Sequence, residues 1–150
     1  MRSPARRSNQ KGFTLLEVIV VIIILGVLAT VALPRLFSNI EFSRSAEALN
    51  AMGVLRQSIE RCGLMQGGYA TCNDFTNLAM ANPSTEAGSH FDYTITINDA
   101  AEGDYVITAT RNATLDNGDG TSTITLTVDA EPVTGGGSVT RAGTGVFGAI

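Results

Sequence analysis

The stretch "KGFTLLEVIVVIIILGVLATVALPRLF", residues 11–37, decides the fold of this chain. From Phe13 to Leu33 there are 21 residues, of which only Glu17 is charged. A helix of that length covers about 30 Å, the thickness of a bilayer core. The preceding "MRSPARRSNQK" is basic, and basic flanks stay on the cytoplasmic side of a membrane. The sequence therefore predicts a membrane-spanning helix whose C-terminal side lies outside the cytoplasm.

Two simpler interpretations of this segment fit less well. A cleaved signal peptide has an apolar run of about 7–15 residues that ends in small residues, whereas this run is longer and continues into "LPRLFSN". A plain signal anchor leaves Glu17 without a purpose, because an isolated carboxylate in a bilayer is costly and usually marks a functional position. A plain signal anchor therefore leaves the position of Glu17 unexplained.

The same residues resemble the class III leader junction of type IV pilins and pseudopilins. In that family a short basic leader ends in Gly, and the mature chain begins with Phe and carries a Glu at its fifth position; here these are Gly12, Phe13 and Glu17. The resemblance implies cleavage between Gly12 and Phe13 by a prepilin peptidase, followed by N-methylation of Phe13. It also implies that Glu17 pairs with the N-terminal amine of a neighbouring subunit, since a buried charge is tolerable when it is paired.

The helix is predicted to continue to about Arg61 and to stop at Gly63. Gly26 and Pro34 bracket weak helix formers, so we expect either a kink near Thr30 to Pro34 or a stretch that melts on assembly, as in related pilins. Beyond this point, apolar residues at helical spacing predict one buried face: Phe42, Ala46, Leu49, Met52, Leu55 and Ile59. The first half is apolar all round and has to be surrounded, whereas the second half has to dock on its own chain.

The C-terminal body alternates apolar and polar residues in three segments, 91–98, 104–111 and 122–129, which is typical of half-buried strands. A shorter fourth strand is expected around Ser138 to Arg141. Residues 63–90 form a connecting loop, with a short helix near Asp74 to Met80. The predicted fold class is α+β: a long N-terminal helix packed on a three- to four-stranded antiparallel sheet, in agreement with the pilin fold.

The two cysteines, Cys62 and Cys72, are separated by nine residues. A metal site would need further ligands, and the only histidine is His90, so a disulfide is favoured. Closing this short loop stabilises the fold by about 2.5–3 kcal/mol on the chain-entropy model and implies an extracytoplasmic location. Many type IV pilins close a C-terminal loop with a disulfide, and because no cysteine follows Cys72, the properties of that loop are not carried over.

The charge distribution bears on the class of function. Four of the ten basic residues lie in the first eleven positions, and all fourteen acids come later. So acidic a body gives no sign of nucleic-acid binding through a general basic surface. The sequence has no phosphate-binding loop, nucleophile motif or catalytic carboxylate pair, so we expect neither an enzyme nor a cofactor.

Three further features of the sequence bear on metal binding, glycosylation and the role of the histidine. In "DNGDGT", Asp116 and Asp119 are weak calcium candidates, since pseudopilins of type II secretion have a calcium site in their C-terminal region; the Asn-Gly and Asp-Gly pairs favour a hairpin turn instead. Asn112 begins an "NAT" pattern that permits N-glycosylation without indicating it. His90 is predicted to be a loop residue without a partner.

These observations predict a leader at 1–12, a transmembrane and filament-core helix half at 13–36, and an extracytoplasmic head domain at 37–150. The expected function is that of a type IV pilin, a structural subunit that polymerises into a helical pilus for adhesion, motility or DNA uptake. Its expected partners are the inner membrane, a prepilin peptidase and the pilus assembly platform, and its final location is the cell surface. The alternatives are a pseudopilin of a type II secretion system and a membrane-anchored binding module that never polymerises.

Overall fold

The computed structural model describes residues 12–115, 118–130 and 137–148, without the side chains of residues 34, 35 and 38. The chain divides into two compact units, Met1–Phe37, here the N-terminal unit, and Ser38–Ile150, here the head unit. One long helix and four strands make up the regular structure, with two short 3₁₀ turns: α1 (Leu15–Gln66), η1 (Pro83–Thr85), β1 (Phe91–Asp99), β2 (Asp104–Arg111), β3 (Thr123–Asp129), β4 (Ser138–Gly143) and η2 (Gly145–Phe147). The α+β class and the fourth strand are confirmed.

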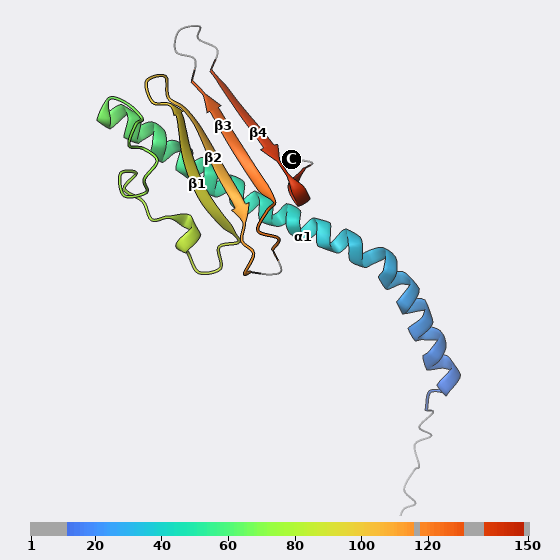
Figure 1. Cartoon of the computed structure of the whole chain (residues 1–150). Coiled ribbons are helices and arrows are strands. Elements are labelled where there is room, and N and C mark those ends of the chain that lie inside the picture. The colour runs from blue at the N-terminus through green and yellow to red at the C-terminus, as the bar shows by residue number, and fades with distance from the viewer. Residues whose placement is uncertain (1–11, 116–117, 131–136, 149–150) are drawn as a thin grey trace, which may run out of the picture. The chain divides into compact units, whose positions relative to one another are not determined.

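The sheet of the head unit is an antiparallel meander in the order β1-β2-β3-β4 (Figure 1). One row of facing residues runs across it, from Ile95 to Ile107, then to Leu126 and to Arg141. Side chains that face one another across a ladder lie on the same side of a sheet, so this row belongs to the side that packs on α1. Figure 1 shows the second half of α1 crossing that side.

The core lies between this side of the sheet and α1. Met52, Leu55 and Ile59 are fully buried, as predicted. The predicted face was wrong at its start, because Phe42 is 73% exposed and Ala46 is also exposed. The buried row begins instead with two small residues, Ser45 and Ala48. The Ser45 hydroxyl donates to the Phe42 carbonyl at 2.6 Å, so it needs no partner outside the helix.

The helix ends later than predicted, at Gln66 instead of at Gly63. Gly67 follows with a φ of 70°, in the left-handed region that glycine tolerates, and the Gly68 amide donates to the Gly63 carbonyl at 3.0 Å. This is a Schellman cap. Gly63 therefore does not end the helix. It leaves room for Tyr69, because a Cβ at this position would lie 2.5 Å from the Tyr69 ring.

The loop after α1 lacks the helix predicted near Asp74 to Met80, and this prediction was wrong. The Asp74 carboxylate accepts from the Thr76 amide at 2.8 Å, and Ala79 has a φ of 52°. A short side chain that bonds to its own backbone competes with helix formation, and a left-handed residue ends the turn. The segment is a series of turns, one of which places Leu78 in the core.

A disulfide joins Cys62 to Cys72 and ties this loop to the last turns of α1. Tyr69 lies within the closed loop, and its ring packs against Gly63 on one side and Gly103 on the other. The ring also stacks on that of Tyr105, with 6.3 Å between the ring centroids. The disulfide and the ring together fix the end of the helix against the sheet.

We expect Gly63→Ala to lower the free energy of unfolding of the head unit by about 1–3 kcal/mol, because the new methyl group overlaps the Tyr69 ring. The matched control is Gly53→Ala, in the same helix but with no atom within 4 Å of the added Cβ. It should stabilise by about 0.5–1 kcal/mol through helix propensity. Urea unfolding of a fragment lacking residues 1–28 measures both, and equal effects of the two changes would contradict the packing of Tyr69.

Candidate functional site

The N-terminal unit presents an apolar surface on every side of the helix. Leu15–Leu33 has a mean hydropathy of 3.0 with none of that window buried, and by length and composition it is the one helix of the described residues able to cross a membrane. Val18, Ile19, Val20 and Val21 point about 100° apart, yet they are 51%, 43%, 47% and 49% exposed. Every side of this segment is therefore exposed within the N-terminal unit as the structure describes it.

The first turn of α1 is capped by its own side chains. The Thr14 hydroxyl accepts from the Glu17 amide at 3.2 Å, and Glu17 is the acidic residue of the first turn. Thr-x-x-Glu is the pattern of a capping box, and a carboxylate at this position also interacts favourably with the positive end of the helix dipole. This role was not predicted, although the spacing of Thr14 and Glu17 in the sequence was enough to indicate it. The cap holds Glu17 at a defined place before any partner binds.

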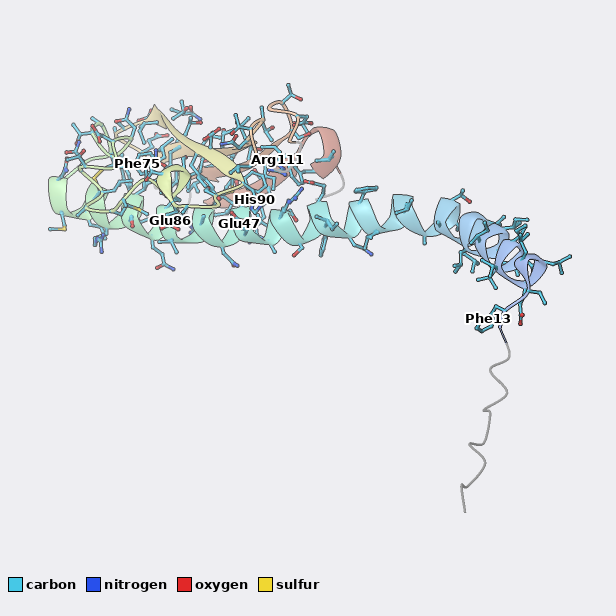
Figure 2. All side chains as sticks on the ribbon, turned by 90° about the horizontal axis from the view of Figure 1, so that it is seen from below. Phe13, Glu47, Phe75, Glu86, His90 and Arg111 are labelled. Carbon is cyan, nitrogen blue, oxygen red and sulfur yellow. A yellow bond between two sulfur atoms is a disulfide. The ribbon has the colours of Figure 1, made fainter. Side chains whose placement is uncertain are left out.

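Glu17 also lines a shallow groove of about 310 Å³ together with Phe13, Val18, Val21 and Ile22. Phe13, labelled in Figure 2, precedes the cap, where an apolar residue typically packs against the first turn as a hydrophobic staple. The groove is apolar apart from one carboxylate. Once another apolar surface covered it, that carboxylate would attract a cation far more strongly than it does in water.

The structure describes only part of the N-terminal segment for which features were predicted. Helical conformation runs without a break through Gly26 and Pro34, and the Thr30 hydroxyl donates to the Val27 carbonyl at 2.7 Å. Melting in an assembled state stays a prediction. Residues 1–11 of the predicted leader lie outside the described residues, and Gly12 is exposed.

In the head unit, a buried arginine ties the end of β2 to α1. Arg111 is 1% exposed; one of its terminal nitrogens donates to the His90 carbonyl at 3.0 Å, and its Nε lies 3.4 Å from Glu41 Oε2. The guanidinium also lies 5.9 Å from the centre of the Phe91 ring. Within the described part of the chain, Nε and Nη2 have no hydrogen-bond acceptor. The alternation of β2 already placed Arg111 on the side of Tyr105, but the sequence analysis did not use this signal.

His90 has a partner, so the prediction of a lone loop residue was wrong in that respect. Its Nδ1 lies 2.8 Å from Glu47 Oε2, and its backbone amide donates to Glu47 Oε1 at 3.3 Å. The two residues are 43 positions apart, which is why no spacing in the sequence indicated the pair. The pair holds the start of β1 on α1.

Asp119 makes the bonds of a turn. Its carboxylate accepts from the Thr121 amide at 3.0 Å, from the Ser122 amide at 2.9 Å and from the Ser122 hydroxyl. These bonds, the Ser122 hydroxyl first, lower the pKa of Asp119 to about 2. Asp116, the other calcium candidate, lies outside the described residues. Within the described ranges, no group of three or more His, Cys, Asp or Glu residues could hold a metal ion.

Comparison with known proteins decides the family. Residues 7–33 match the model of the prokaryotic N-terminal methylation motif. The type IV major fimbrial protein FimA of Dichelobacter nodosus is 32% identical over 120 residues, which cover 71% of this chain and 76% of the relative. The chain belongs to the type IV pilin and pseudopilin family.

Other relatives come from both branches of this family. A second FimA of Dichelobacter nodosus is 32% identical over 111 residues, covering 74% of this chain and 70% of that protein. The type II secretion system core protein G of Dickeya chrysanthemi is 36% identical over 77 residues, covering 51% of this chain and 50% of that protein. No solved structure shows a significant similarity. The chain therefore has a pilin-like, structural role, and its apolar helix and methylation motif indicate membrane anchoring.

We expect Glu41→Gln to lower the free energy of unfolding by about 2 kcal/mol, since it leaves the buried Arg111 without a carboxylate; the loss is smaller than for a fully buried pair because Glu41 is partly exposed. Glu60→Gln is the matched control. It breaks the exposed pair with Arg56 and should cost less than about 0.5 kcal/mol. Urea unfolding of the fragment lacking residues 1–28 compares them, and equal losses would contradict a structural role of the buried pair.

The lowered pKa of Asp119 predicts a dependence of stability on pH. A depressed pKa means that the carboxylate stabilises the folded state above its ordinary pKa of 3.8, and that this contribution is lost as the pH falls toward 2. The wild-type fragment should therefore be more stable than Asp119→Ala near pH 6, and the difference should shrink below pH 4. Thermal unfolding at each pH measures it. A difference that stayed constant down to pH 2 would show that the bonds to Ser122 and Thr121 do not depend on the charge.

Proposed function

We propose that this chain is a type IV pilin, a structural subunit that polymerises into an extracellular pilus. The observation that carries the proposal is the uncovered apolar helix with a single carboxylate in its groove. Such a surface is stable only in lipid or among other apolar helices, so the same segment fits a membrane anchor before assembly and the core of a filament afterwards. The chain would then divide into a leader at 1–12, a filament-core helix half at 13–36 and a head domain at 37–150.

The proposed chemistry begins with the peptide bond between Gly12 and Phe13. A prepilin peptidase cleaves this bond on the cytoplasmic side of the inner membrane and leaves a cationic amine on Phe13, which is then methylated. In the filament, the Glu17 carboxylate of one subunit meets this amine of its neighbour among apolar side chains. A buried pair repays its desolvation poorly, but a subunit in the wrong register would leave two unpaired charges, so the pair selects axial register more than it adds stability.

The share of the chain that the two long fimbrial matches cover supports a pilin over a pseudopilin. The matches to two fimbrial proteins cover 71% and 74% of this chain, whereas the match to a third covers 37% and the match to core protein G covers 51%. The longer matches take in more of the head unit, which is the part in which the two branches differ. The second candidate function is a pseudopilin of a type II secretion system, which shares the N-terminal segment and is also represented among the relatives.

We expect Glu17→Gln subunits to be cleaved but to assemble poorly, because the amide keeps the shape of the side chain and removes the charge that pairs with the Phe13 amine. The matched control is Glu102→Gln, an exposed acid in the β1–β2 turn, which should assemble normally. Electron microscopy of sheared filaments measures the yield, and mass spectrometry of their subunit should find N-methylated Phe13 at the N-terminus. Processed Glu17→Gln subunits that assemble at the wild-type yield would contradict the role of Glu17.

Deletion of the gene separates the two candidate functions. For a pilus, surface filaments disappear and protein secretion continues. If the deletion abolishes protein secretion and the parent strain has no surface filaments, the result favours the pseudopilin. An uncleaved chain that stays in the inner membrane would contradict both and favour the non-polymerising anchor.

A further inference from the structure

The head unit has a pocket of about 260 Å³ between α1 and the start of β1. Glu47 and Ala51 of α1 line one side, and the segment from Pro83 to Ser89, with Glu86, lines the other. Tyr93 of β1 completes the wall. Figure 2 shows Glu47, Glu86 and His90 on the same side of the head unit. Two carboxylates thus face a pocket that is large enough for a side chain.

The groups in this pocket are suited to a cationic hydrogen-bond donor. Tyr93 is only 4% exposed, yet its hydroxyl, at the pocket, is hydrogen-bonded to no group that the structure describes. Burial raises the pKa of the Tyr93 hydroxyl, and the charges of Glu47 and Glu86 raise it further, so the hydroxyl stays protonated close to both carboxylates. Glu86 has no ion pair among the described residues, and Glu47 is engaged by His90 alone. Glu47 and Glu86 are exposed at this pocket, so both carboxylates can be reached by a cationic group from outside the chain.

The head unit also carries a cation without a partner. Of the arginine side chains that the structure describes, Arg44, Arg56 and Arg111 pair with acids and Arg61 donates to the Leu78 carbonyl. Arg141 of β4 is exposed and has no acceptor among the described residues. It faces Leu126 across the ladder and so lies on the core side of the sheet, at an edge strand where that side is uncovered; its neighbour on this side, Val139, is 42% exposed.

The two features lie at opposite edges of the sheet. The pocket adjoins β1, and Arg141 lies on β4, three strand spacings away, or about 14 Å. The core and α1 lie between them on this side of the sheet, so Arg141 cannot fill the pocket of its own chain. A contact between two different patches of identical subunits is heterologous, and when it does not close into a ring it generates an open helical filament.

We propose that Arg141 of one subunit inserts into the pocket of Glu47, Glu86 and Tyr93 on the next subunit. The guanidinium pairs with Glu86 and with the Glu47 carboxylate, and it donates to the Tyr93 hydroxyl oxygen. Arginine suits this site because its planar fork offers several donors at once and tolerates desolvation better than an ammonium group. This inference rests on the proposed filament and adds to it a specific contact between heads.

The test uses full-length chains expressed in cells that lack the wild-type gene. Arg141→Gln and Thr140→Glu each make the net charge more negative by one, but Thr140 points to the other side of β4. We expect Arg141→Gln to lower the amount of sheared filament by about tenfold, since one carboxylate pocket per subunit loses its cation. Thr140→Glu should assemble like the wild type. The amount of processed subunit in the membrane, measured by immunoblot, should be unchanged in both variants, so that a folding defect is recognised.

A charge exchange sharpens the test. Arg141→Glu and Glu86→Arg should each reduce filaments, and the double variant should recover them, because each subunit then offers the reversed pair to its neighbours. In filaments that combine Arg141→Cys with Glu86→Cys, a short bismaleimide should link successive subunits into a ladder, and each single cysteine variant alone should give no ladder.

Three results would overturn the inference. Arg141→Gln filaments at the wild-type yield would do so, as would a double charge variant no better than the single ones. A pocket that binds Ca²⁺ in calorimetric titration of the wild-type chain, with the binding lost in Glu86→Gln, would assign the site to a metal ion. A wild-type chain that forms no filaments at all would instead count against the proposed function, and the two failures are thereby distinguished.

Discussion

The apolar surface of α1 between Leu15 and Leu33 is exposed on every side within the described N-terminal unit, and the anchoring and assembly proposed for the chain depend on this. Burying apolar area contributes about 25 cal/mol per Å², so a helix exposed on all sides cannot stay in water. Lipid covers it in the membrane, and other copies of the same helix can replace the lipid. Since lipid tails and apolar side chains are equally apolar, this exchange supplies little driving force or specificity by itself. Specificity has to come from polar groups, and Glu17 is the one acid of the segment.

The head unit meets a different constraint, because its half of α1 is apolar on one side only. The buried row of this half begins with two small residues, Ser45 and Ala48, and continues with larger ones further along. At one end the disulfide and the ring of Tyr69 lock the helix to its loop. At the other end Glu41 and Glu47 hold the last residue of β2 and the residue before β1. Both ends of the β1–β2 hairpin are thus fastened to one helix.

Two kinds of contact between subunits follow from the charges of this chain. Glu17 lies in a groove that becomes apolar on all sides once covered, where a wrong register leaves unpaired charges in a low dielectric. The pocket of Glu47 and Glu86 lies at the surface, where an ion pair is weaker and screened by salt. The first contact suits the choice of register along the helices. The second contact suits the alignment of successive heads, because one weak ion pair per subunit is repeated along the whole filament.

The sequence by itself determined the membrane-length helix, the N-terminal methylation motif at residues 7–33, the α+β class and the strands, because each of these is a local pattern of apolar residues or a short motif. Only the tertiary structure decided which side of α1 docks, since Phe42 fits a helical period as well as Ser45 does, yet Ser45 is the residue that is buried. It also decided the partners of His90 and Arg111, because Glu47 and Glu41 lie far away in the chain. Local composition sets what each segment can become; the side on which it packs depends on shapes and charges that meet only after folding.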